Sequence, residues 1–123
     1  MIVIDSSFWI EFFIGTKNGA KIISLLENED EILVPAIVIT EVYKKFLNDS
    51  TIEIATSILR KLSTFKIVTF DYELSVLSAT LSKEYKLPLA DSIIYATAMK
   101  HNAEIYTFDK HFENLPNVKY FQK

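Results

Sequence analysis

Short apolar runs alternate along the chain with longer segments in which apolar residues recur every three or four positions. The runs are rich in Ile and Val and present no polar face, which is typical of strands buried on both faces of a parallel sheet. They predict strands at residues 2–4, 32–34, 67–70 and 105–108, and a short edge strand at 118–121.

The segments between the strands have helical periodicity. In the clearest of them, the residues from Ile52 to Leu62 place their apolar side chains on one stripe. Residues 48–50 are expected to cap this helix, and Asp71 the next one. Helices are expected at residues 8–14, 20–27, 36–47, 52–62, 72–85 and 89–100. Strands that alternate with helices predict right-handed crossovers and a parallel sheet, in one three-layer α/β domain that spans residues 1–123.

Composition excludes several kinds of site. Half of the residues are apolar and none is Cys, so a disulfide framework and a thiolate metal site are ruled out. The only two glycines, Gly15 and Gly19, cannot form a P-loop or a GxGxxG motif. No signal-peptide pattern is present, and no apolar run approaches the ~20 residues that span a bilayer. We therefore expect a soluble, cytoplasmic protein.

The charge balance limits the ways in which the chain could bind nucleic acid. The net charge is −3, and Arg60 is the only arginine among thirteen basic residues. Generic, tight binding of phosphate groups is therefore not expected. An enzyme that contacts nucleic acid locally, through a metal ion, remains compatible with this composition.

Two acidic residues come directly after predicted strands. Asp5 follows the strand at 2–4, and Asp109 follows the strand at 105–108. In open α/β sheets, ligands bind at the carboxyl ends of the strands. The alternative is that each acid only caps the helix or turn that comes next, and near Asp5 the serines 6 and 7 offer further cap oxygens.

Two more acids interrupt apolar stretches near the start of helices. Glu41 lies within the apolar segment 36–43, where the alternative is a surface pair with Lys45 that contributes a few tenths of a kcal/mol. Asp91 follows residues 87–90, where the alternative is an interaction with the helix dipole of about 0.3–1 kcal/mol. Both positions, like the two strand ends, are ones that a parallel sheet brings to one edge.

Carboxylates that gather at one edge need a cation. Their mutual repulsion raises some of their pKa values unless an ion is present, and hard oxygen ligands select Mg²⁺ or Mn²⁺. Such an ion could activate water and neutralise charge on a phosphoryl oxygen. Other schemes have little support, because His101 and His111 lie in polar contexts that are expected to be exposed. No serine lies in a nucleophile elbow.

Four motifs, taken in order, resemble those of PIN-domain ribonucleases. They are Asp-Ser-Ser at 5–7, Glu41, Asp-Ser-Ile-Ile-Tyr-Ala-Thr-Ala at 91–98 and Thr-Phe-Asp at 107–109. The short chain resembles in particular the toxin of VapC type from toxin–antitoxin pairs. The resemblance extends from residue 2 to about residue 121.

The resemblance implies a fold, a site and an activity. The fold is a PIN-like α/β/α domain with a five-stranded parallel sheet in the order 3-2-1-4-5. The site holds one or two Mg²⁺ or Mn²⁺ ions on the four acids Asp5, Glu41, Asp91 and Asp109. Ser7 and Thr107 would be supporting hydroxyls that orient carboxylates or water. A metal-bound water would cleave single-stranded RNA, leaving 5′-phosphate and 3′-hydroxyl ends.

Two features depart from the family pattern. His111 stands where many relatives have another acid. The near absence of arginine leaves the positioning of RNA to lysines, for which a plain solvated surface is the alternative; the candidates are Lys44, Lys45, Lys83, Lys86 and Lys110.

Large apolar residues crowd the first predicted helix. One seven-residue helix is not expected to bury all of them against a single sheet: Phe8, Trp9, Ile10, Phe12, Phe13 and Ile14. Part of this surface, with the following helix, is therefore expected to face an antitoxin segment or a second copy of the chain, and we expect a homodimer. The alternative is a helix buried on all sides.

The tripeptide Thr-Phe-Asp occurs twice, at 69–71 and at 107–109, each time at the end of a predicted strand. In the implied strand order, the fourth strand adjoins the first, whereas the third lies at the sheet edge. Asp109 is therefore expected to reach the metal, and Asp71 only to cap its helix.

Two other functions remain open. The first is a non-catalytic PIN-like binding or scaffold module, which has no physical reason to keep four clustered acids. The second is a phosphatase of haloacid-dehalogenase type, which would need a second aspartate two residues after Asp5, where Ser7 stands.

Overall fold

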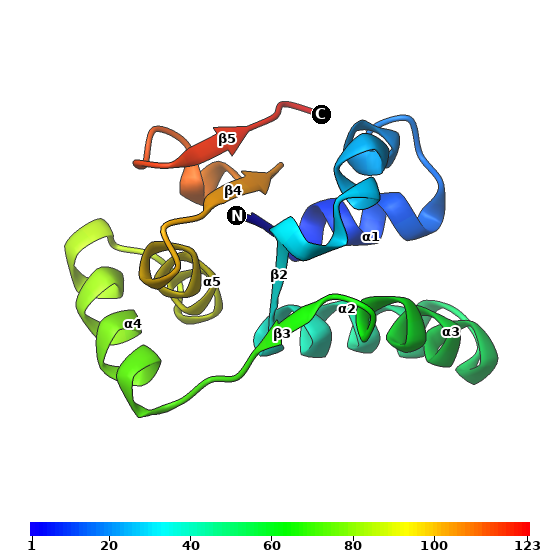
Figure 1. The fold of residues 1–123 in the computed structure, drawn as a ribbon, viewed down its shortest axis with the longest axis horizontal. Coiled ribbons are helices and arrows are strands. Elements are labelled where there is room, and N and C mark those ends of the chain that lie inside the picture. Colours follow the sequence, from blue (N-terminus) through cyan, green and yellow to red (C-terminus); the bar gives the residue numbers. More distant parts are fainter.

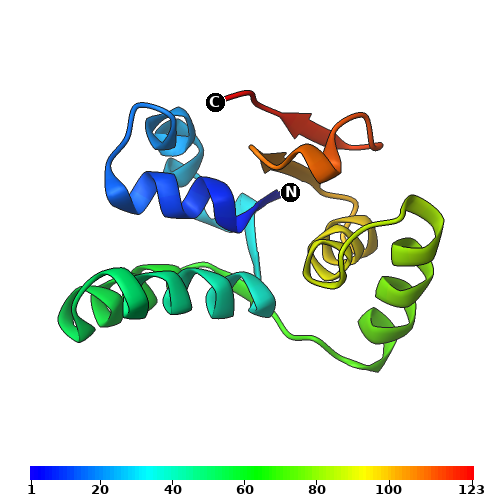
Figure 2. The ribbon, with the colours of Figure 1, turned by 180° about the vertical axis from the view of Figure 1, so that it is seen from behind.

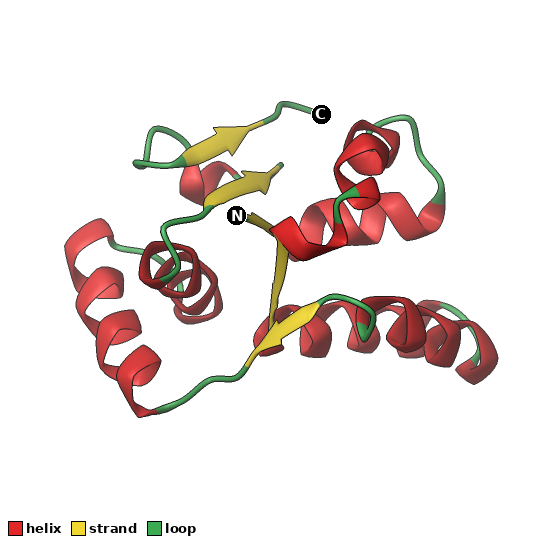
Figure 3. Cartoon of the chain, viewed as in Figure 1, coloured by secondary structure: helices red, strands yellow, loops and turns green.

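The computed structural model describes residues 1–123 as five strands connected by helices (Figures 1 and 3). The strands are β1 (Ile2–Ile4), β2 (Ile32–Pro35), β3 (Lys66–Val68), β4 (Glu104–Thr107) and β5 (Val118–Tyr120). The α-helices are α1 (Ser6–Ile14), α2 (Ala36–Asp49), α3 (Ile52–Leu62), α4 (Tyr72–Tyr85) and α5 (Leu89–Lys100). Three 3₁₀ segments complete the chain: η1 (Gly19–Glu27), η2 (Glu29–Glu31) and η3 (Lys110–Phe112).

The five strands form one parallel sheet in the order β3-β2-β1-β4-β5, which confirms the expected fold class and strand order. The central strand is β1, where Val3 pairs with Leu33 of β2 on one side and with Ile105 of β4 on the other. Because all strands run in the same direction, the residues that follow β1 and β4 leave the sheet at the same edge and side by side.

Helices lie on both sides of the sheet, which explains why the central strands have no polar face. In Figures 1 and 2, α4 and α5 pack together on one side, and α1, α2 and α3 lie on the other. Side chains of both strand faces are therefore withdrawn from water, and Val3, Ile4, Leu33 and Val34 are completely buried. They belong to one continuous apolar core.

The first helix does not bury all of its large apolar side chains, as the sequence suggested: Ile10, Phe12 and Phe13 are half-buried. Phe8 and Trp9 have no exposed surface, and the ring of Phe8 stacks on Phe108 with 3.9 Å between centroids. The outward-facing apolar residues of this region are Ile14 in α1 and Ile23 in η1, each more than half exposed.

Both glycines of the chain shape the turn between α1 and η1. Gly15 has a φ of 91° and its amide donates to the carbonyls of Glu11 and Phe12, which ends α1 in the left-handed conformation that glycine favours. Gly19 packs directly on α1, because a Cβ there would lie 2.3 Å from the Glu11 carbonyl carbon. Its amide donates to Thr16 Oγ1 (3.0 Å).

Several predicted boundaries were wrong. The segment expected as a helix at 20–27 is a 3₁₀ segment. It begins at Gly19, which packs tightly on α1. Helix α2 continues to Asp49, and Thr51 rather than residues 48–50 caps α3, because its hydroxyl accepts from the Ile54 amide (3.2 Å).

Three strands also end earlier than expected, and the last of them ends at Tyr120 rather than residue 121. The third ends at Val68 rather than residue 70. The fourth ends at Thr107 rather than residue 108, because the Phe108 amide donates to Ser7 Oγ (3.2 Å) instead of continuing the ladder.

Candidate active site at the carboxyl end of the sheet

Asp5 leaves the central strand and turns its carboxyl into the protein. It occupies the N-cap position of α1, but its side chain makes no capping hydrogen bond. Instead, Oδ2 accepts from the hydroxyls of Ser7 and Thr107, both at 2.8 Å. The residue is only 3% exposed. The structure therefore excludes the interpretation of Asp5 as a simple helix cap.

The two hydroxyls that hold Asp5 also tie β4 to the start of α1. Thr107 Oγ1 accepts from the Asp109 amide (2.9 Å), and Ser7 Oγ accepts from the Phe108 amide. Each hydroxyl thus donates to the carboxylate and accepts from the backbone, which fixes its direction. Ser7 and Thr107, the two residues expected as supporting hydroxyls, thus both donate to the Asp5 carboxylate.

Burial makes the charge on Asp5 costly. Removal from water raises the pKa of the Asp5 carboxyl, against the opposing effect of the hydroxyls of Thr107 and Ser7, and the charge of Asp109 raises it further. A buried carboxylate with a raised pKa beside a second acid is a common feature of functional sites.

Glu41 reaches the same edge of the sheet from α2. Its Oε1 accepts from Ser6 Oγ at 3.0 Å. Lys45 pairs instead with Asp49 (2.6 Å), so the surface pair between Glu41 and Lys45 does not form. Burial raises the pKa of Glu41, and the charges of Asp5 and Asp109 add to the rise.

Asp91 and Asp109 approach from the other side, together with His111. Asp91 lies in the first turn of α5, and His111 Nδ1 is 2.8 Å from its Oδ2 and 3.1 Å from Asp109 Oδ1. The same Oδ1 accepts from the His111 amide (2.9 Å), so Asp109 also caps η3. Burial raises the pKa of Asp91 to about 6, with further contributions from the charges of Asp109 and Asp5.

The four predicted acids therefore come together, although not all of them are equally close. Asp5 joins Asp109 through the hydroxyl of Thr107, and the charge of Asp109 acts on the pKa of Asp5, Glu41 and Asp91. The tightest group is Asp91, Asp109 and His111, whose ligand atoms all lie within 4.8 Å of one another.

Sequence reasoning missed two polar contacts of this site. His111 is exposed, as expected, but its ring bridges Asp91 and Asp109, and these two acids raise its pKa. Ser6, considered only as a possible cap, donates to Glu41. The one local signal for His111 is its position two residues after Asp109.

Asp71, the second copy of the Thr-Phe-Asp aspartate, lies elsewhere. Its Oδ1 accepts from the Leu74 amide (2.9 Å), which caps α4, and its Oδ2 is 3.6 Å from Lys100 Nζ. The Leu74 amide, followed by Lys100, lowers its pKa. The expectation that Asp71 caps its helix is confirmed.

A family comparison agrees with this geometry. The model of the PIN domain matches residues 2–118. The chain belongs to the PIN domain family. None of the curated proteins is similar enough in sequence to match.

Solved structures give the same result for the fold of this PIN domain. A toxin–antitoxin complex from Klebsiella pneumoniae is 26% identical, with a TM-score of 0.86 and complete coverage of both chains. VapBC2 from Rickettsia felis, bound to a DNA fragment from its promoter, is 20% identical with a TM-score of 0.79, covering 99% of this chain and 100% of that one. VapC20 from Mycobacterium tuberculosis, a toxin that cleaves the sarcin–ricin loop, is 17% identical with a TM-score of 0.78, covering 96% and 97%.

Basic residues flank the acidic edge of this PIN domain. Lys44 and Lys45 line a hollow of about 350 Å³ together with Ser6, Glu41 and Asn48. In addition, Lys21 Nζ lies 5.7 Å from the centre of the Phe108 ring. Of the other lysines considered above, Lys110 directly follows Asp109, whereas Lys83 and Lys86 are exposed at the end of α4.

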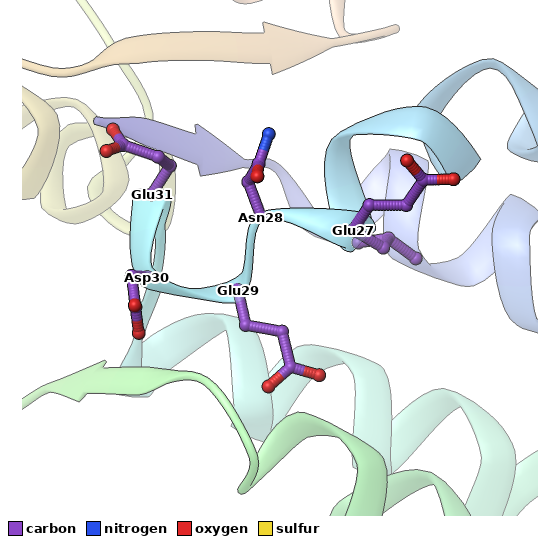
Figure 4. Close-up of a pocket in the computed structure, with 6 residues that line it drawn as sticks. Glu27, Asn28, Glu29, Asp30 and Glu31 are labelled. Atoms are coloured by element: carbon purple, nitrogen blue, oxygen red, sulfur yellow. The ribbon is translucent and has the colours of Figure 1, made fainter.

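The largest hollow of the PIN domain is not at this edge. It measures about 560 Å³ and is lined by Leu26 and the polar residues 27–31 (Figure 4). These residues precede β2, so they lie at the amino end of the sheet, away from Asp5. Two of the acids already have partners, Glu31 with the N-terminal amine and Glu29 with Lys61.

None of the helices has the length and apolar character needed to cross a membrane.

Proposed function

We propose that this PIN domain is a ribonuclease that uses Mg²⁺ or Mn²⁺ to cleave single-stranded RNA internally, and that it is the toxin of a toxin–antitoxin pair. One observation carries the proposal. Carboxylates from four separate parts of the chain meet around a buried aspartate, and the pKa values of Asp5, Glu41 and Asp91 are all raised. Such a cluster is costly by itself and becomes favourable when it holds a cation.

The donors of the cluster suit a hard divalent ion. Glu41, Asp91 and Asp109 each use one oxygen for a contact within the chain and keep the other without a hydrogen-bond donor. In Asp5, both hydroxyl contacts fall on Oδ2. Carboxylates that use one oxygen for a contact within the chain and leave the other oxygen free can bind Mg²⁺ or Mn²⁺.

The chain itself supplies position and orientation. Ser7 and Thr107 hold the Asp5 carboxylate in one direction, and Ser6 does the same for Glu41. An ion held by these carboxylates would supply positive charge for the phosphate and a bound water of lowered pKa as the nucleophile. The expected products carry 5′-phosphate and 3′-hydroxyl ends.

The substrate is expected to bind across the acidic edge. Lys44 and Lys45 lie beside Glu41, and Lys21 lies beside Phe108, the residue before Asp109, so cations are present near the carboxylates. A few lysines next to a metal site can position a single strand without the broad basic surface that duplex binding requires.

The partners are an antitoxin and a second copy of the chain. Ile14 and Ile23, in α1 and η1, remain exposed after the chain has buried Phe8 and Trp9. Apolar side chains that a monomer leaves in water are available for a partner. The first comparison above is, by its description, a toxin–antitoxin complex.

The test combines metal binding with RNA cleavage. Millimolar Mg²⁺ or Mn²⁺ should raise the melting temperature, by the equivalent of about 2.7 kcal/mol at a concentration of 100 Kd, because the ion binds only the folded state. Asp5→Asn should lose most of this shift and the cleavage of single-stranded RNA. The matched control is Asp30→Asn, at the opposite edge of the sheet, which should behave as wild type.

The results separate the alternatives. A wild-type protein whose melting is indifferent to metal would refute the cluster as an ion site. RNA binding without cleavage would support a non-catalytic binding module, and hydrolysis of small phosphate esters in place of RNA would support a phosphatase.

A further inference from the structure

The ring of His111 lies between two carboxylates that come from different elements. Its Nδ1 is 2.8 Å from Asp91 Oδ2, in the first turn of α5, and 3.1 Å from Asp109 Oδ1, after β4. The only other histidine, His101, lies at the far end of α5, about 15 Å along the helix axis from Asp91. One nitrogen donor is therefore placed among the oxygens of the acidic edge.

We propose that His111 Nδ1 binds the metal ion together with Asp91 and Asp109, so that the site prefers Mn²⁺ and heavier first-row ions over Mg²⁺. This inference rests on the proposed function, since the same carboxylates hold the ion. It adds the identity of a nitrogen ligand and the choice of metal.

The spacing of the three groups is the first argument. Two neighbouring ligands of an octahedral ion with bonds of about 2.1 Å lie about 3.0 Å apart. The separations of Nδ1 from the two carboxylate oxygens, 2.8 and 3.1 Å, are close to this value. All three ligand atoms lie within 4.8 Å of one another, so they can surround one ion once Nδ1 has released the proton that it donates to the carboxylates.

The backbone around His111 supplies the second argument. The His111 amide donates to Asp109 Oδ1 (2.9 Å), and the Asp109 amide donates to Thr107 Oγ1 (2.9 Å). The loop is thus anchored to the hydroxyl that also holds Asp5. The His111 side chain is 58% exposed, and its Nδ1 contacts both acids.

The nature of the donor gives the preference between metals. Carboxylate oxygens suit Mg²⁺ and Mn²⁺ alike, whereas an imidazole nitrogen favours transition-metal ions. A site of two carboxylates and one imidazole should therefore bind Mn²⁺ more tightly than Mg²⁺, and His111→Asp should remove much of that difference.

Pulsed electron paramagnetic resonance of bound Mn²⁺ tests the nitrogen directly, without an activity measurement. The wild-type protein with one equivalent of Mn²⁺ should show the modulation of a directly bound ¹⁴N nucleus. His111→Asp should lose this signal, and His101→Gln, which alters the other histidine, should keep it. Because His111 is an exposed side chain, its replacement should leave the circular dichroism spectrum unchanged.

Calorimetric titration with Mn²⁺ and Mg²⁺ supplies a second measurement. In His111→Asp the ratio of the Mg²⁺ Kd to the Mn²⁺ Kd should fall by about tenfold or more relative to wild type. Mn²⁺ that binds and supports RNA cleavage without a ¹⁴N signal would overturn the role of His111 and leave the proposed function intact. Failure of the wild-type protein to bind Mn²⁺ at all would overturn both.

Discussion

Replacement of Asp91 by asparagine should stabilise the metal-free protein above pH 7. Burial, with the charges of Asp109 and Asp5, raises the pKa of Asp91 from an ordinary 3.8 to about 6. Below pH 3.8 the carboxyl is protonated in both the folded and the unfolded state, so the two proteins should be equally stable. As the pH rises through 6, the folded state must lose a proton that it holds more tightly than the unfolded state does, and wild-type stability falls.

The magnitude follows from the size of the shift. At 1.36 kcal/mol for each pKa unit, the rise corresponds to about 3 kcal/mol. Solvent reaches part of this carboxyl and screens its charge, which reduces the expected gain in Asp91→Asn to about 1–2 kcal/mol. The lost contact with the exposed His111 offsets little of it.

The assay is urea unfolding in EDTA at a series of pH values between 4 and 8. Trp9 is the only tryptophan and is completely buried, so its fluorescence reports the loss of the core. The difference between variant and wild type should be near zero at pH 4 and should grow to its full value by pH 7. With saturating Mn²⁺ the order should reverse, because only the wild type keeps the full set of acids.

Asp71→Asn is the matched control, in which the change in stability should have the opposite sign. The Leu74 amide and Lys100 lower the pKa of Asp71, so its charge contributes stability that is present above pH 3.8 and is lost as the pH falls. This variant should be less stable than wild type at pH 7. An Asp91→Asn variant that is destabilised at pH 8 in EDTA, or whose effect does not change with pH, would contradict the reasoning.

Two further predictions concern the surroundings of Asp5 and the repeated tripeptide. Thr107→Val removes a buried hydroxyl that donates to Asp5 and accepts from the Asp109 amide. The free energy of unfolding, measured by denaturation, should therefore fall by about 1–3 kcal/mol. The metal affinity, measured by calorimetry, should fall by about 10–100-fold. Asp109→Asn should weaken metal binding and slow RNA cleavage, while the stability of the metal-free protein stays the same or increases. In contrast, Asp71→Ala should lower the melting temperature and leave cleavage per folded molecule unchanged. The reverse pattern would refute the assignment of the two aspartates.

The sequence by itself determined the alternation of elements and the class of the fold. Apolar runs without a polar face and apolar stripes of helical period can be recognised from neighbouring residues alone. This is because the number of buried faces of a strand or helix determines which of its positions must be apolar. The residues alone predicted a parallel sheet with Asp5 and Asp109 at its carboxyl edge. The strand order came from the resemblance to PIN domains, and the structure confirms it.

The tertiary structure decided which polar side chains meet. Ser6 and Glu41 are 35 residues apart and Asp91 and His111 are 20 apart, and neither pair has a spacing that any local period would favour. The aspartates of the two Thr-Phe-Asp tripeptides follow the same two residues and each caps the next helical segment, yet only Asp109 joins the acidic cluster. The physical reason is that β3 lies at the sheet edge and β4 pairs with β1, so only the second tripeptide ends beside Asp5.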